Sequence, residues 1–139
     1  MTGTDLRTGQ LTDPTFRAEI AAKTGGLCTY CGMRLGDKYD IDHFHAKANG
    51  GEATIANLMP ACGDCNGSKG KMGIEEWRVS VARKRFREKV GMPYFSKQQR
   101  EYLESIGIDV YANIEPKPFW FETVGFNAAN DNTTRKEAA

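Results

Sequence analysis

The chain has 139 residues, of which 40% are hydrophobic and 27% charged, and its formal net charge is +1. This length predicts one small domain, or a compact core with an appendage. No apolar stretch approaches the length needed to span a membrane, and no basic start followed by an apolar run suggests a signal peptide. We therefore expect a cytoplasmic protein without membrane association.

The small net charge conceals three blocks of different sign. Residues 1–66 carry 6 Lys/Arg and 8 Asp/Glu, residues 67–100 carry 10 and 3, and residues 101–139 carry 3 and 7. A local basic block attracts a polyanion even when the whole chain is nearly neutral. Residues 67–100 are therefore the candidate region for contact with nucleic acid.

The first predicted element is a helix near the N-terminus. Residues 1–12 are polar and unpatterned, so we expect them to be flexible. Asp13 is a suitable N-cap, and Pro14 is favoured at the first helical position. Gly25 and Gly26 are typical of a helix end.

All four cysteines stand in two Cys-x-x-Cys pairs, Cys28/Cys31 and Cys62/Cys65. A two-residue gap lets both thiolates of a tight turn reach one ion, and four thiolates complete a tetrahedral zinc site. In the cytoplasm such pairs are better interpreted as metal ligands than as disulfides. We expect a structural Zn²⁺, with disulfides or free thiols as the alternatives.

Two short extended segments are predicted between the cysteine pairs. Residues 39–45 alternate as a strand does, which places Asp42 on one face and His43 on the other. A glycine-containing loop follows. Residues 57–61 form the second segment, which Pro60 shortens or confines to a sheet edge.

Two helices are predicted next. The first begins at the second cysteine pair and includes Asn66 and Lys69, and the glycines that follow weaken it. Residues 74–90 then have a helical pattern. Three basic residues of this second helix line up along it, either as a nucleic-acid contact or as a solvated face: Arg78, Arg85 and Lys89.

The C-terminal part is predicted to contain one helix and two short strands. Ser96 is a suitable cap for a helix over about 97–106, and residues 108–114 and 119–124 are interpreted as strands. The Phe-Trp-Phe run at 119–121 could stack bases, but alternation in a short strand favours core packing. From residue 127 onward the chain is small and polar, and we expect disorder.

Four polar side chains between and beside the cysteine pairs could carry chemistry. The carboxylate of Asp42 and the amide of Asn66 offer hard oxygen ligands that suit Mg²⁺ or Mn²⁺. His43 is a suitable general base, since an imidazole titrates near pH 6.5, and Asn57 could hold an imidazole or a loop. Taken singly, His43 is better interpreted as a packed histidine, and a helix cap is the alternative for Asn66.

Taken together, these motifs resemble the HNH endonucleases of the ββα-metal superfamily, in the subgroup with a four-cysteine zinc. The resemblance covers residues 27–71, about a third of the chain. The matching residues are Cys28, Cys31, Asp42, His43, Gly50, Gly51, Asn57, Leu58, Cys62, Cys65, Asn66, Lys69 and Gly70. Many members have histidine where this chain has Asn66, while others have asparagine, so this departure bears on the tolerance of softer metals such as Zn²⁺ or Ni²⁺ and not on catalysis.

The resemblance implies an α+β fold with a small ββα-metal core. It also implies a DNA endonuclease or nickase that uses a catalytic Mg²⁺ or Mn²⁺ and leaves 5′-phosphate and 3′-hydroxyl ends. His43 would be the general base, Asn57 would hold the loop and orient His43, and Asp42 and Asn66 would bind the catalytic ion. Lys69, with the basic stripe, would contact DNA.

The expected organisation has four parts: a flexible N-terminus over 1–12, a nuclease core with flanking helices over 13–90, a C-terminal helix with short strands over 91–126, and a tail over 127–139. This short chain fits a phage or mobile-element nuclease, or a small restriction enzyme. The sequence gives no indication of oligomeric state. The competing interpretation is a non-catalytic zinc-ribbon module that binds nucleic acid.

Overall fold

The computed structural model describes residues 13–126. These residues divide into two compact units: the first contains the residues up to Ile74 together with those from Pro118 onward, and the second is Glu75–Lys117. The predicted flexible N-terminus and the predicted C-terminal tail lie outside the described residues. The two units meet at Ile74 and Glu75, and the segment from Pro118 belongs to the first unit, whereas the expected divide at residue 90 stays a prediction.

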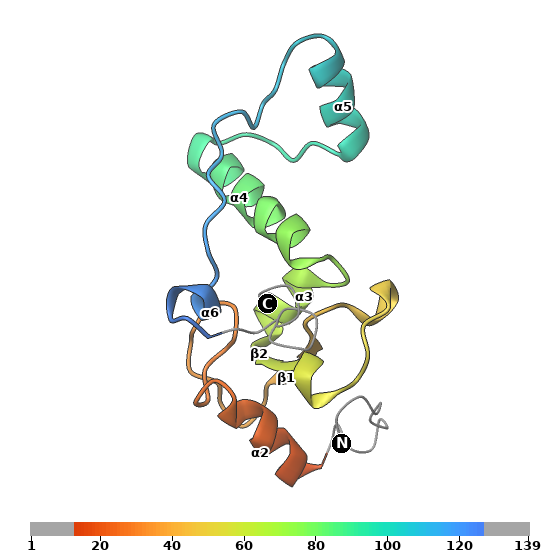
Figure 1. The fold of residues 1–139 in the computed structure, drawn as a ribbon. Helices are drawn as coiled ribbons and strands as arrows, with labels where there is room; N and C mark the ends of the chain where they lie inside the picture. The colour runs from red at the N-terminus through yellow and green to blue at the C-terminus, as the bar shows by residue number, and fades with distance from the viewer. Residues whose placement is uncertain (1–12, 127–139) are drawn as a thin grey trace. The chain divides into compact units, whose positions relative to one another are not determined.

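The first unit opens with helix α2 (Pro14–Ala22), as the sequence predicts. The side chain of Asp13 accepts a hydrogen bond of 2.9 Å from the backbone N–H of Phe16, which caps the first turn. Phe16 and Ile20 project from successive turns and pack with Leu58 as a buried apolar cluster. The helix thereby lies against the second strand (Figure 1).

The centre of the unit is a two-stranded antiparallel sheet followed by a helix. Strand β1 (Asp40–His43) pairs with β2 (Leu58–Ala61), with Asp42 opposite Met59 and His43 opposite Leu58. Two single 3₁₀ turns, η1 (Lys47–Asn49) and η2 (Ile55–Asn57), lie in the connection. Helix α3 (Gly63–Lys69) follows directly and contacts β1. This ββα order in an α+β fold confirms the predicted fold class.

The segment after Pro118 is a helix, so the predicted strand over 119–124 is wrong. Helix α6 (Trp120–Thr123) follows Phe119, and the backbone N–H groups of Trp120 and Phe121 donate to the carbonyl oxygens of Tyr30 and Thr29 at 2.9 and 3.1 Å. Phe119 and Phe121 are both buried, and both rings meet the ring of Tyr30 edge-on. The core-packing interpretation of these aromatic residues is therefore confirmed, although they lie at the start of a short helix and not in a strand.

The second unit is mainly helical. It contains α4 (Ile74–Val90), whose first residue belongs to the other unit, and α5 (Lys97–Ser105), which begins with the predicted cap at Ser96. The predicted strand over 108–114 is wrong: a side-chain oxygen of Asp109 accepts from the backbone N–H of Tyr111 at 3.1 Å, and the segment turns. In the part of the chain that the structure describes, no helix is long and apolar enough to cross a membrane.

Candidate metal centre and nuclease site

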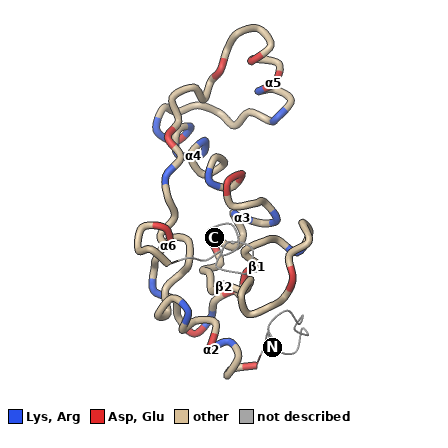
Figure 2. Tube along the Cα trace, in the orientation of Figure 1, with Lys and Arg blue, Asp and Glu red and all other residues tan. Residues whose placement is uncertain are grey.

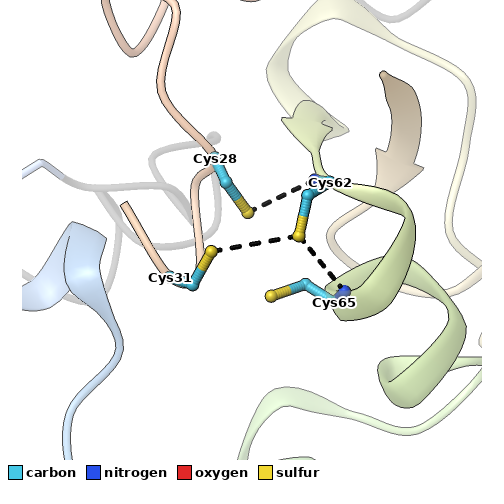
Figure 3. A group of neighbouring side chains, drawn as sticks. All are labelled: Cys28, Cys31, Cys62 and Cys65. Carbon is cyan, nitrogen blue, oxygen red and sulfur yellow. Dashed lines mark hydrogen bonds between the residues drawn. The ribbon is translucent and has the colours of Figure 1, made fainter. Parts of the chain in front are cut away.

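The four cysteines converge, although the two pairs are 31 residues apart (Figure 3). Their sulfur atoms all lie within 4.8 Å of one another, and the cysteines form no disulfide. One pair sits in the turn after α2, and the other caps and begins α3. The zinc-site prediction, and not the disulfide alternative, fits this geometry.

The sulfur spacing can be compared with that of a tetrahedral metal site. Zinc–sulfur bonds of about 2.3 Å place two ligands of a tetrahedron about 3.8 Å apart, and the sulfurs of Cys31 and Cys62 are 3.9 Å apart. Backbone N–H groups also donate to sulfur, from Cys62 to Cys28 and from Cys65 to Cys62, both at 3.4 Å. Such bonds favour thiolates, so the donor set fits Zn²⁺.

The acid–base behaviour of the cysteines shows why four sulfurs at this distance need a cation. A hydrogen bond from Cys65 lowers the pKa of Cys28 to about 4, whereas burial raises the pKa of Cys31 to about 11. The pKa of Cys65 is also raised, chiefly because its thiol donates to Cys28. The thiolate of Cys28 forms readily, and its negative charge disfavours ionisation of the neighbouring thiols. A bound divalent cation would offset the repulsion between the thiolates.

The cysteine-bearing turn is closed by the returning C-terminal segment. Gly32, directly after Cys31, has φ of +76°, and a Cβ atom there would lie 2.4 Å from Cδ1 of Trp120. Glycine is required at this position both by the backbone conformation and by the indole that lies over it. The aromatic segment is therefore part of the wall of the metal centre.

Asp42 lies in the interior of the first unit and does not project into solvent. Its Oδ2 accepts a hydrogen bond from the hydroxyl of Tyr30 at 2.5 Å and lies 3.2 Å from Nζ of Lys69. Burial raises the pKa of Asp42, and the bonds from Tyr30 and Lys69 oppose that rise. These contacts fall on one carboxylate oxygen.

The burial of Lys69 does not fit its predicted contact with DNA. Its side chain is 0% exposed, and Nζ donates to the carbonyl oxygen of His43 at 2.9 Å in addition to pairing with Asp42. A lysine this deep is retained only when its charge is compensated. It connects α3 to the Asp-His pair, and its side chain is not exposed to an approaching phosphate.

His43 ends β1 as a half-buried residue, and its carbonyl oxygen is the acceptor of the Lys69 bond. Alternation along the strand separates its side chain from that of Asp42. The same alternation places Ile41 on the His43 side, where it packs on the apolar cluster of α2. The structure thus brings the backbone of His43, and the side chain of Asp42, to one lysine.

Asn57 is buried and fastens the end of β1 to the connecting loop. Its Oδ1 accepts from the backbone N–H of His45 at 2.8 Å, and its Nδ2 donates to the carbonyl oxygens of His45 and Glu52 at 3.1 and 2.8 Å. The backbone oxygen of Asn57 also accepts from Phe44 at 2.8 Å. These bonds match the loop-holding part of its predicted role, and the orientation of His43 by Asn57 stays a prediction.

Asn66 is half-buried on α3, and its Nδ2 donates to Oδ2 of Asp40 at 3.0 Å. The side chain therefore meets a carboxylate two residues before Asp42, on the same face of β1. The sequence interpretation gave no role to Asp40 or to Tyr30. The alternation of Asp40 with Asp42, and the place of Tyr30 inside a Cys-x-x-Cys turn, were signals for both.

The three residues of the predicted basic stripe all lie in the second unit, and they differ in exposure and in hydrogen-bond partners. Arg85 and Lys89 are exposed on α4, where basic residues are frequent (Figure 2). Arg78 instead pairs with Glu75 at 2.9 Å through both Nε and Nη2, and its Nη1 donates to the carbonyl oxygen of Lys117 at 3.1 Å. Arg78 stabilises the unit, while the other two side chains are available to a polyanion.

The comparison with protein-family models agrees with this geometry. No curated protein matches the chain in sequence. Residues 28–72, which include both cysteine pairs, both strands and α3, match the model of the HNH endonuclease family. The match covers about a third of the chain, and the four clustered cysteines fit the zinc-containing subgroup of that family.

Proposed function

We propose that this protein is a divalent-metal-dependent HNH endonuclease or nickase that hydrolyses phosphodiester bonds of DNA. The observation that supports it best is the ββα arrangement inside the family match: β1 presents the Asp-His pair, Asn57 directly precedes β2, and α3 presents Asn66 beside β1. A zinc-ribbon binding module needs none of these polar residues.

His43 is the proposed general base. Its place at the end of a short strand, with its carbonyl oxygen held by Lys69 and the next residues held by Asn57, restricts the backbone that carries the imidazole. A general base must be kept in position, since proton transfer depends on hydrogen-bond distance. His43 would accept the proton of the attacking water.

Asp42 and Asn66 are the proposed ligands of the catalytic ion. The contacts of Asp42 fall on Oδ2 and those of the Asn66 side chain on Nδ2, so one oxygen of each is not engaged by them. Two hard oxygens suit Mg²⁺ or Mn²⁺, which keep several waters when bound by protein. When bound, the ion would supply charge stabilisation at the phosphate and at the leaving oxygen.

The four-cysteine ion is proposed to be structural. Its ligand set is closed, so it has no position for water or substrate. It joins the turn after α2 to the start of α3, and this connection fixes the helix that carries Asn66. Contact with the DNA backbone is assigned to Arg85 and Lys89.

The test is a nicking assay on supercoiled plasmid with Mg²⁺, Mn²⁺ or EDTA, followed by sequencing of the product ends. We expect cleavage that needs the added divalent ion and leaves 5′-phosphate ends. His43→Ala should lose turnover by roughly two to four orders of magnitude while DNA binding persists. Cleavage by His43→Ala close to that of the unmodified protein would reject the mechanism and favour a binding module.

A further inference from the structure

Helix α3 presents two polar side chains to β1, and each meets a different carboxylate. Asn66 donates to Asp40 at 3.0 Å, and Lys69 pairs with Asp42 at 3.2 Å. Residues three apart on a helix and two apart on a strand share a face, so the two pairs are consecutive contacts of one interface. Only Asp42 has a proposed role in the reaction.

The two carboxylates differ in what their partners can do. Lys69 compensates the charge of Asp42, whereas Asn66 offers Asp40 an amide that has one donor end and one acceptor end. A carboxylate only accepts hydrogen bonds, so it selects the amide orientation in which nitrogen faces Asp40. The opposite orientation would bring two oxygens together.

We propose that Asp40 is a positioning residue that fixes the amide of Asn66, so that the amide oxygen is the atom presented for the catalytic cation. This inference rests on the proposed function, in which Asn66 is a ligand. Without Asp40, the amide of Asn66 would rotate between its two ends, and only one end can bind a cation. Outer partners of this kind typically change metal affinity by 10- to 100-fold.

The experiment measures Mn²⁺ binding to the zinc-loaded full-length protein by titration calorimetry, independently of cleavage. Asp40→Ala should weaken Mn²⁺ binding by roughly 10- to 100-fold, with zinc content unchanged. Asp40→Asn keeps an acceptor oxygen but can turn its own amide, so it should fall between Asp40→Ala and the unmodified protein. Asp37→Ala, which removes an exposed carboxylate just before β1, is the control for loss of charge and should bind Mn²⁺ normally.

A double variant separates positioning from an independent effect. If Asp40 acts only through Asn66, the variant Asp40→Ala/Asn66→Ala should bind Mn²⁺ no more weakly than Asn66→Ala alone. Additive losses would show that Asp40 attracts or binds the ion itself, and would overturn the proposal. A lowered melting temperature with normal Mn²⁺ affinity in Asp40→Ala would reduce the contact to a structural one and would also overturn it.

The outcome for Asn66→Ala distinguishes the two levels of inference. Weak Mn²⁺ binding by Asn66→Ala with normal binding by Asp40→Ala would reject the positioning role and leave the proposed function standing. Normal binding by Asn66→Ala would reject Asn66 as a ligand, and the role of Asp40 with it.

Discussion

Nζ of Lys69 lies 3.2 Å from Oδ2 of Asp42, and both side chains are almost fully buried. The same ammonium group donates to the backbone of His43. One lysine on α3 therefore contacts both members of the Asp-His pair, one through its side chain and the other through its backbone. The first prediction follows from this contact.

Lys69→Met should destabilise the fold and move the acid limit of cleavage. Removing one partner of a buried ion pair costs about 3–5 kcal/mol, because the other charge is left uncompensated. Burial already raises the pKa of Asp42, and Lys69 is one of the groups that oppose the rise. In the variant the carboxylate should protonate at higher pH, so cleavage should be lost earlier as the pH falls.

Urea unfolding and a pH–rate profile check both parts of this prediction. Lys71→Met is the matched control, because Lys71 is an exposed lysine two residues further along. An unchanged stability and an unchanged acid limit in Lys69→Met would contradict the role given to this pair.

Gly32→Ala should destabilise the metal-bearing turn. The new Cβ atom would lie 2.4 Å from Cδ1 of Trp120, and the backbone is in the left-handed region, which alanine disfavours. Overpacking of this kind costs about 1–3 kcal/mol. Thermal unfolding of the zinc-loaded protein measures the effect. Gly36→Ala is the control, since a Cβ atom there has no neighbour within 4 Å, and an equal loss in both variants would argue against the Trp120 contact.

Cys62→Ser should cost folding and solubility as well as activity. Cys62 is both a proposed zinc ligand and the N-cap of α3, where its sulfur accepts from the N–H of Cys65. Three thiolates hold zinc less tightly, and part of the folding free energy of a small zinc domain comes from metal binding. Zinc content by elemental analysis and circular dichroism provide the measurement. A well-folded, metal-free Cys62→Ser protein that still cleaves DNA would refute a structural metal.

Charge reversal at Arg85 and Lys89 should weaken DNA binding and reduce its salt dependence. Each lost phosphate contact lowers the slope of log affinity against log salt by roughly one unit. Fluorescence anisotropy over a salt series measures this slope. Lys97→Glu, which reverses an exposed charge on α5, should have a smaller effect. Arg78 is left out because it pairs with Glu75, and an unchanged slope for the double variant would place the DNA elsewhere.

Local signals predicted most of the elements. The caps at Asp13 and Ser96 each accept the expected backbone bond, and the helical period of 74–90 matches α4. The spacing of the cysteines indicated a metal site because two Cys-x-x-Cys turns together supply the four thiolates of one tetrahedral ion. These features depend on residues close in sequence, where propensity and pattern are informative.

Two of the errors came from contacts between distant residues. Alternation over 119–124 indicated a strand, but Phe119 and Phe121 alternate because both rings pack on Tyr30. The backbone of this segment donates hydrogen bonds to the cysteine-bearing turn, and not to the edge of a sheet. Lys69 resembled a surface lysine until the fold placed Asp42 beside it. The sequence pattern predicts which face of a helix or strand a residue occupies. Which residue it contacts on that face depends on the tertiary fold.

The last prediction concerns Asn66 and the choice of metal. Asn66→Ala removes a proposed oxygen ligand, so part of its loss of cleavage should be recovered by raising Mn²⁺. Asn66→His should retain some activity and shift the preference toward Mn²⁺, Co²⁺ or Ni²⁺, because an imidazole suits those ions better than Mg²⁺. His43→Ala should respond to none of them, because it lacks the base and not a ligand. A nicking time course across the metal series, with DNA binding measured in parallel, compares the three variants. Recovery of His43→Ala by Mn²⁺ to the same extent as Asn66→Ala would show that the two residues share one role, which would contradict the separation of base and ligand.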